Sequence, residues 1–189
     1  MTPGRPEPAP GDRLVLGFLA FSLTAAFSLE LYFVLNFQDI GGRHDLFARG
    51  FQLYGAGDRT YSGQGDTYFP FALETINVFL VQLLNCALGY AIVRSRVWRH
   101  PLQLVIGSYL SGSVVLYFWH AHAAGYPDMP EHRSWNYFLF YAPNLPWLVG
   151  NFCMAVASFR GLVRSLKQGG AHMPGVNHSA TSDRTSPHG

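Results

Sequence analysis

Residues 68–93 have the sequence YFPFALETINVFLVQLLNCALGYAIV, and Glu74 is the only charged residue among them. As an α-helix this stretch would extend for about 39 Å, since each residue adds roughly 1.5 Å. The hydrocarbon core of a bilayer is only about 30 Å thick. The stretch also lacks the polar face that a helix of a soluble bundle turns to water. It therefore predicts a helix that spans a membrane.

Three further stretches are similarly apolar, so the sequence predicts four spans, over residues 14–37, 68–93, 101–120 and 135–159. The predicted fold is all-α, a four-helix transmembrane bundle over residues 14–166. Residues 1–13 are rich in Pro and Gly, and residues 167–189 are polar and of low complexity. We expect these two ends to form a disordered leader and a disordered tail.

The composition of the chain excludes two other classes of protein. Hydrophobic residues make up 49% of the 189 positions and charged residues 13%, whereas about 25% of residues are charged in a typical soluble domain. The formal net charge of +2 is too small for a nucleic-acid-binding protein, and no basic patch with interleaved aromatic residues is present. We therefore expect a membrane protein with no nucleic-acid partner.

Basic residues predict the orientation of the spans. The connection over residues 94–100 carries three arginines and no acid. Three more cations follow the fourth span, namely Arg160, Arg164 and Lys167. With four spans, this connection and both termini lie on one side of the membrane. Because cytoplasmic loops are enriched in Lys and Arg, we expect both termini in the cytoplasm.

Two acidic side chains lie inside the predicted spans, at matching depths. Glu30 precedes the end of the first span by about seven residues, and Glu74 follows the start of the second by about six. At about 1.5 Å per residue, both lie roughly 10 Å below the non-cytoplasmic surface. A carboxylate in hydrocarbon costs at least a few kcal/mol, so it needs a partner or a cavity and is by default a functional group.

Three more side chains are predicted to join these acids in one layer. Asn77 follows Glu74 by three positions on one helical face, and Asn144 and Trp147 share a face of the fourth span. Two carboxyl groups in a pocket of low dielectric constant do not both ionise easily, so one can donate a proton and the other accept one. An indole face stabilises a nearby cation. This set favours moving a double bond in an apolar substrate; alternatively, the polar groups only hydrogen-bond the helices together.

Three histidines near the non-cytoplasmic side form a weak metal-binding pattern. His120 and His122 lie at the end of the third span, and His132 follows in a loop rich in Pro and Gly. No cysteine or carboxylate at a suitable spacing completes a set of ligands. We therefore expect interfacial histidines, no metal site and no cofactor.

Six short segments occur in an order and spacing that is typical of one membrane-protein family. They are Leu29-Glu30 with Leu31-Tyr32-Phe33-Val34-Leu35, Gly57-Asp58-Arg59-Thr60-Tyr61, Leu73-Glu74-Thr75-Ile76, Leu102-Gln103-Leu104-Val105, Leu116-Tyr117-Phe118, and Asn144 with Trp147. On these segments the chain resembles the emopamil-binding protein family, the EXPERA-domain membrane proteins that include the sterol Δ8–Δ7 isomerase. The resemblance covers residues 14–154.

The resemblance implies roles for the residues grouped by depth. In the isomerases the acids of the first and second matching helices carry the proton transfers, which makes Glu74 and Glu30 the expected catalytic residues. The Asn and Trp of the last helix line the pocket there, so Asn144 and Trp147 are expected to bind substrate, with Asn77 beside them. The family also implies a sterol or another polycyclic isoprenoid as ligand and the endoplasmic reticulum membrane as location. A homodimer is left open.

The chain departs from the isomerases at three positions and in its span count. Ala26 stands where the isomerases have a His one turn before the first acid, and Leu110 and Val114 stand where they have Gln and Asp. The isomerases also have an additional leading span. Four spans is the count of the sigma-2 receptor, a sterol-binding relative. The resemblance therefore implies a second hypothesis, a non-catalytic protein that binds or transports sterols or other lipids.

Overall fold

The computed structural model describes residues 10–170, and within this range every element of secondary structure is helical. In chain order the elements are α1 (Pro10–Ala25), η1 (Ala26–Glu30), α2 (Leu31–Asn36), η2 (Ile40–Gly42), α3 (Leu46–Tyr54), η3 (Arg59–Ser62), α4 (Tyr68–Thr75), η4 (Ile76–Val81), α5 (Gln82–Val93), α6 (Arg99–Ala123), α7 (Ser134–Tyr141), η5 (Ala142–Asn144) and α8 (Leu145–Gly170). The segments η1 and η4 are π-helical, and η2, η3 and η5 are 3₁₀ turns.

Four of these helical runs are long and apolar enough to cross a bilayer: Pro10–Asn36, Tyr68–Val93, Arg99–Ala123 and Ser134–Gln168. Many large apolar side chains on their outer surfaces are exposed, among them Leu35, Val105 and Phe152. In water such a surface would be unfavourable, whereas lipid covers it without cost. The predicted four-helix transmembrane bundle is therefore confirmed, and the chain is a multi-pass membrane protein.

The second helical run, Tyr68–Val93, has the bounds of its predicted span. The other three runs are longer than the predicted spans, because hydropathy marks the hydrocarbon layer and not the end of the helix. The first helix begins at Pro10, inside the expected leader, and proline is well tolerated in the first turn. The third helix extends to Arg99 and Ala123 at its two ends. The last continues to Gly170, beyond the predicted boundary at Lys167. Residues 1–9 and 171–189, which make up the rest of the expected leader and tail, lie outside the described residues.

The fourth span is interrupted, unlike the single helix that its composition predicts. Its helical run passes from α7 through the 3₁₀ turn η5 into α8. Pro143 lies in this turn and Pro146 in the first turn of α8. Because proline has no backbone N–H, it removes a hydrogen bond from the regular α-helical ladder. The interruption brings Asn144 to the junction of the two helices.

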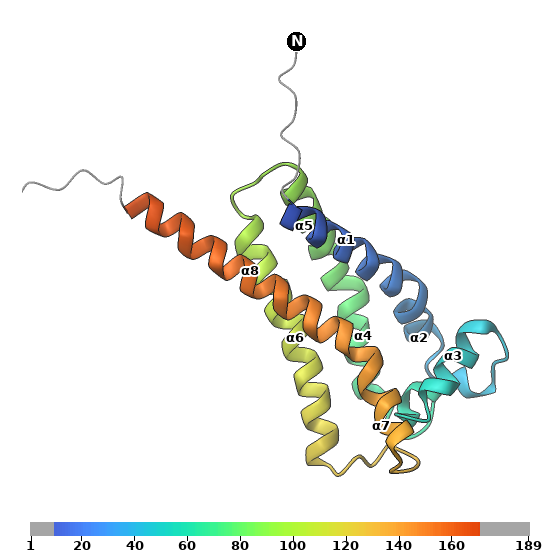
Figure 1. Cartoon of the computed structure of the whole chain (residues 1–189). Coiled ribbons are helices and arrows are strands. Elements are labelled where there is room, and N and C mark those ends of the chain that lie inside the picture. The colour runs from blue at the N-terminus through green and yellow to red at the C-terminus, as the bar shows by residue number, and fades with distance from the viewer. Residues whose placement is uncertain (1–9, 171–189) are drawn as a thin grey trace, which may run out of the picture.

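The start of α1 and the end of α8 lie toward one end of the bundle, and a folded cap lies at the other (Figure 1). Helix α8 lies along α6, and α1 packs against α5. The helix start at Pro10 and the connection between α5 and α6 lie at the same end of the bundle (Figure 1). The opposite end, here named the distal face, is formed by the segment with α3 and η3 and by the connection between α6 and α7.

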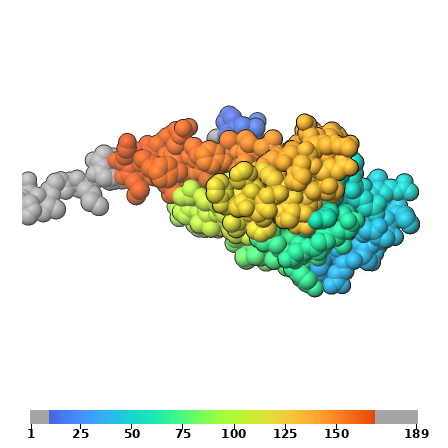
Figure 2. Space-filling view, turned by 90° about the horizontal axis from the view of Figure 1, so that it is seen from below, coloured from blue at the N-terminus to red at the C-terminus, as the bar shows by residue number. Residues whose placement is uncertain are grey.

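Two segments that are far apart in sequence pack together at the distal face. In the view from below, the surface of the α6–α7 region lies directly against that of the α3–η3 region (Figure 2). The backbone N–H of Arg59 donates to the Asp128 carbonyl at 2.9 Å. The Asn136 side chain donates to the carbonyl of Ala56 at 2.6 Å. These bonds hold the two segments together above the membrane-spanning helices.

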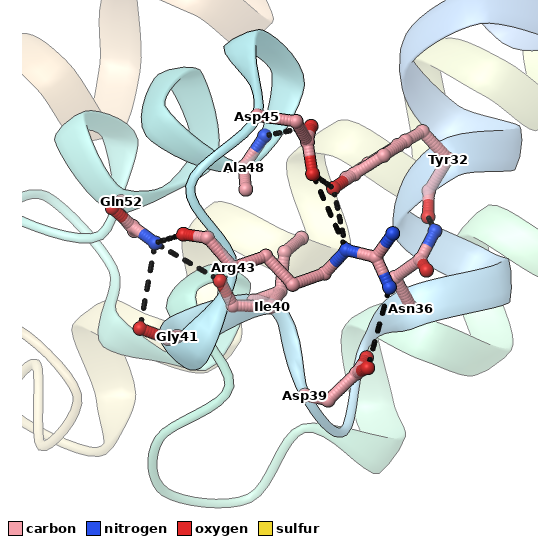
Figure 3. A network of polar contacts seen from close by, with 9 residues as sticks. All are labelled: Tyr32, Asn36, Asp39, Ile40, Gly41, Arg43, Asp45, Ala48 and Gln52. Atoms are coloured by element: carbon pink, nitrogen blue, oxygen red, sulfur yellow. Dashed lines mark hydrogen bonds and ion pairs between the residues drawn. The ribbon is translucent and has the colours of Figure 1, made fainter.

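A polar network fixes α3 against the end of α2 (Figure 3). Asp45 caps the N-terminus of α3, since its Oδ1 accepts from the backbone N–H of Ala48 at 3.1 Å. Its Oδ2 accepts from the Tyr32 hydroxyl at 2.6 Å and lies 3.3 Å from Nε of Arg43. Gln52 donates to the carbonyl of Arg43 at 2.8 Å. The loop is therefore anchored at both ends of α3.

We expect the cap of α3 to persist to low pH. The hydrogen bond from Tyr32, followed by that from Ala48, lowers the pKa of Asp45 from 3.8 to about 2. Because the folded pKa is depressed, the stabilisation is fully present above pH 3.8 and is lost as the pH falls through about 2. Hydrogen exchange of residues 46–54, corrected for intrinsic rates, should therefore stay slow at pH 3 and rise only near pH 2.

Variants of two neighbouring aspartates test this expectation. In Asp45→Asn, exchange over residues 46–54 should already be faster at pH 7, because the charged acceptor of the cap is gone. Asp39→Asn is the control, since Asp39 has only an exposed ion pair with Arg43 at 3.3 Å. Equal exchange in the two variants would contradict the role of Asp45.

Candidate functional site

A cavity of about 590 Å³ lies inside the bundle, between the helices and under α3. Its volume is in the usual range for a small-molecule site, roughly 300–1,000 Å³. All five residues predicted from the sequence to form the site line this cavity: Glu30, Glu74, Asn77, Asn144 and Trp147. They come from η1, α4, η4, η5 and α8. The folded chain therefore brings together the side chains that depth alone had grouped.

Both acids lie next to π-helical turns. Glu30 is the last residue of η1, and Glu74 lies two residues before η4. A π-turn inserts one extra residue into an α-helix, leaves part of the hydrogen-bond ladder unmatched and is frequent at functional sites. Two such turns on facing helices re-aim the acids into one cavity.

The two carboxyl groups have different surroundings. Oε1 of Glu74 accepts from the Tyr61 hydroxyl at 2.8 Å, and Oε2 accepts from the Asn77 side chain at 3.4 Å. Oε2 of Glu30 and Oδ1 of Asn77 are buried and have no hydrogen-bond partner among the described residues. Buried polar atoms without a partner are costly and call for an explanation. A ligand with a polar group in the cavity would satisfy them.

The segment 57–61 supports the site from the distal face. A Cβ atom on Gly57 would lie 2.6 Å from the backbone nitrogen of Phe140, so only glycine allows this approach to α7. Arg59 donates to the carbonyl of Pro127 at 2.5 Å and pairs with Asp128 at 3.4 Å. These contacts hold η3 against the α6–α7 connection.

The other residues of this segment turn inward. Asp58 accepts from the backbone N–H of Thr60 at 3.0 Å and from its hydroxyl at 2.6 Å. It also accepts a hydrogen bond from the hydroxyl of Tyr117. Tyr61 is 7% exposed and reaches Glu74. The segment therefore connects the distal cap to the acid on α4.

The two cavity residues from the last span are held by different helices. Asn144 donates to the hydroxyl of Tyr54 at 2.9 Å and to the carbonyl of Phe140 at 2.9 Å. The indole of Trp147 stacks on Phe21, with ring centroids 5.1 Å apart and an interplanar angle of 25°. The indole is thus held by α1 while it lines the cavity.

At the positions where the chain departs from the isomerases, the structure provides an apolar wall. Leu110 and Val114 both line the cavity, and Ala26 is fully buried in the packing of η1. Polar side chains occur instead on another part of the lining, at Ser22 and Gln82.

Several polar side chains of the cavity could not be identified from the sequence. They are Ser22, Tyr54, Tyr61, Gln82 and Tyr117. Asn85 links two of them, since its side chain donates to Gln82 at 2.9 Å and to Ser22 at 3.3 Å. The only signals for Tyr61 and Tyr117 were their places in the segments 57–61 and 116–118, which carry the family resemblance. Ser22, Tyr54 and Gln82 gave none, because a single Tyr, Ser or Gln in an apolar run is common.

The histidines near the distal face are separate from the cavity. His122 lies 3.3 Å from the hydroxyl of Tyr126, and His132 lies 3.2 Å from that of Tyr137. Within residues 10–170 no cluster of three His, Cys, Asp or Glu side chains could hold a metal ion. We therefore give these histidines no part in the chemistry of the cavity.

Comparison with models of protein families gives a match over more than half of the chain. The family model described as EBP, EXPERA (EXPanded EBP superfamily), matches residues 46–158. The match begins at α3 and includes Glu74, Asn77, Asn144 and Trp147, whereas Glu30 precedes it. No curated protein matches the chain.

Proposed function

The chain belongs to the EXPERA (expanded EBP) superfamily, and we propose that it is a membrane isomerase acting on a sterol or a related polycyclic isoprenoid. The reaction shifts a carbon–carbon double bond within the substrate. The observation that carries this proposal is the shared cavity, in which two intramembrane carboxyl groups and an indole face the same apolar space. We further propose the endoplasmic reticulum membrane as its location, with both termini in the cytoplasm.

The proposed reaction needs one acid, one base and a group that stabilises a cation. A carboxyl group gives its proton to one carbon of the double bond, which leaves a cation on the other carbon. A second group removes a proton from a neighbouring carbon, and its electrons form the new double bond. Glu74 acts as the leading proton-transfer acid and Glu30 as its partner. The substrate gains one proton and loses one, with no net oxidation or reduction of the molecule, so the reaction needs no external oxidant or reductant.

The aromatic and amide groups have supporting roles in this scheme. The indole of Trp147 stabilises the cation through its face, an interaction worth about 2 kcal/mol when water is excluded. Asn144 and Asn77 position the polar groups of the cavity. The apolar wall at Leu110 and Val114 fits the hydrocarbon skeleton of the substrate and excludes water that would trap the cation.

A turnover assay tests the proposal. The full chain is purified into nanodiscs with a Δ8-sterol, and the double-bond position of the product is determined by mass spectrometry. We expect wild-type protein to convert the sterol. Trp147→Leu should lower kcat by about tenfold or more. Trp135→Leu is the control, because Trp135 is exposed and lies outside the cavity. Equal kcat in the two variants would contradict cation stabilisation by Trp147.

The four spans and Ala26 favour a second candidate, a sterol- or lipid-binding protein of the sigma-2 receptor type. In such a protein the unpartnered Oε2 of Glu30 accepts a hydrogen bond from a ligand hydroxyl or amine. Sterol binding is measured in the same nanodiscs. Saturable binding that Glu30→Gln weakens, with no conversion by the wild type, would favour this candidate over the isomerase.

A further inference from the structure

Asp58 is a buried carboxyl group that the proposed reaction does not use. Its side chain is 5% exposed, and the neighbouring Arg59 pairs with Asp128 and not with Asp58. Burial raises the pKa of Asp58, and the donors of Thr60 and Tyr117 oppose this rise. Since the net direction is upward, Asp58 takes up a proton more readily than a surface aspartate does.

Tyr117 separates two cavities. The main cavity contains the acids, and a second one of about 130 Å³, here named the outer pocket, lies under the distal face. Of the described residues, only Tyr117 lines both. The outer pocket is also lined by polar and titratable side chains, namely Asp58, Thr60, Asp66, His120 and Asp128. The rest of the lining is largely apolar, but with these polar groups a pocket of this size has room for a few water molecules, each of which occupies about 30 Å³ in the liquid.

Packed tyrosine rings lead from Tyr117 to the acid of the main cavity. The ring of Tyr61 meets that of Tyr117 edge-on, with centroids 6.3 Å apart, and that of Tyr54 at 4.9 Å. Burial raises the pKa of Tyr54, and the nearby hydroxyl of Tyr117 opposes this rise. The hydroxyl of Tyr61 donates to Glu74 at 2.8 Å.

An isomerase of the proposed kind has a use for such a path. Each turnover leaves the acid without its proton and the base with one, so both groups must be reset before the next turnover. The main cavity is enclosed largely by apolar side chains, including Leu110 and Val114. Protons therefore need a route from the acids to water that does not pass through the substrate.

We propose that Asp58, Tyr117, Tyr54 and Tyr61 form a proton path between water in the outer pocket and Glu74. Asp58 takes up a proton from this water, and each hydroxyl along the path accepts one proton as it releases another. The reverse sequence carries a proton outward. The inference rests on the proposed function for its purpose, but proton exchange at Glu74 is measurable without any substrate.

Infrared spectroscopy of the full chain in lipid tests the path directly. The pH is set where the infrared band of the protonated Glu74 carboxyl group has half of its full intensity. The band is assigned to Glu74 because it is absent in Glu74→Gln. On transfer to D₂O, the band shifts as its proton exchanges. We expect Tyr117→Phe to slow this exchange by about tenfold or more. Asp58→Asn removes the proton-binding group at the outer pocket, and it should slow the exchange as well.

Two comparisons make this test decisive. Tyr137→Phe is the control, because it removes a hydroxyl near the distal face that lines neither cavity. Wild-type exchange rates in both Tyr117→Phe and Asp58→Asn would overturn the proposed path. In turnover assays the path predicts a burst in Tyr117→Phe, with a first turnover at the wild-type rate and slower ones after it. An inactive wild type would contradict the isomerase proposal, while infrared exchange would still decide the proton path.

Discussion

Glu74→Gln is expected to lower the turnover of a Δ8-sterol by about 10²–10⁴-fold, the usual contribution of a general acid or base. The substitution keeps the size of the side chain and can still accept the hydrogen bond from Tyr61. It removes the titratable proton of the carboxyl group and replaces the oxygen that accepts from Asn77 at 3.4 Å by an NH₂ group. The loss should therefore appear in kcat, while sterol binding changes little. We would measure kcat, KM and equilibrium binding in the same nanodiscs.

Glu30→Gln should cause a loss of similar size, because the reaction needs both an acid and a base. Glu131→Gln is the matched control, since Glu131 is exposed on the distal face and paired with Arg133 at 3.1 Å. Unchanged kcat in either cavity variant would remove that residue from the proton transfers.

Gly107→Val is expected to have the largest effect on stability. A Cβ atom on Gly107 would lie 2.6 Å from the carbonyl oxygen of Asn151 and 2.9 Å from the backbone nitrogen of Ala155. Because these are backbone atoms of α8, a side chain must push α6 and α8 apart along their main contact. Overpacking of this kind costs about 1–3 kcal/mol, or more where backbone atoms obstruct. The melting temperature in detergent should fall by several degrees, with aggregation during size-exclusion chromatography.

Gly112→Val is the control for this effect. Gly112 lies on the same helix, and a Cβ atom there would meet nothing within 4 Å. Both variants replace glycine in the middle of a helix by the same β-branched residue, so they share any effect of helix propensity. A melting temperature that falls equally in the two variants would contradict the close contact of α6 with α8.

The sequence predicted the four spans because the bilayer restricts what a chain can do inside it. A spanning helix must satisfy all its backbone hydrogen-bonding groups and cover roughly 30 Å with apolar side chains. This requirement produces a long run of apolar residues that is easily recognised in a sequence. The same geometry converts position along a span into depth. Glu30 and Glu74 could therefore be placed in one layer without knowledge of the packing.

The hydroxyl groups of the cavity could not be predicted in this way. Tyr54 and Tyr61 come from the segment between the first two spans, which folds back over the bundle at the distal face. Tyr117 is one of several aromatic residues at the end of an apolar helix. Their meeting depends on contacts between segments far apart in sequence, such as that between Asn136 and Ala56. No local pattern specifies such contacts.

The π-helical turns were also not predictable. Glu30 in η1 and Asn77 in η4 are unusual for their polarity, but no residue of these two segments indicates a π-turn. A π-turn forms where side-chain packing against neighbouring helices offsets its poorer backbone geometry. The extra residue in each π-turn changes the direction of the acidic side chain. Whether the carboxyl groups enter the cavity therefore depends on how the helices pack.

The most direct test of the isomerase proposal is the origin of the hydrogen that the product gains. The wild-type chain converts a Δ8-sterol in D₂O, and mass spectrometry locates any deuterium in the product. Proton transfer by Glu74 and Glu30 predicts one solvent-derived deuterium per product molecule, on the carbon that received the proton. Absence of conversion, or a shifted double bond without deuterium, would contradict the proposed proton-transfer catalysis.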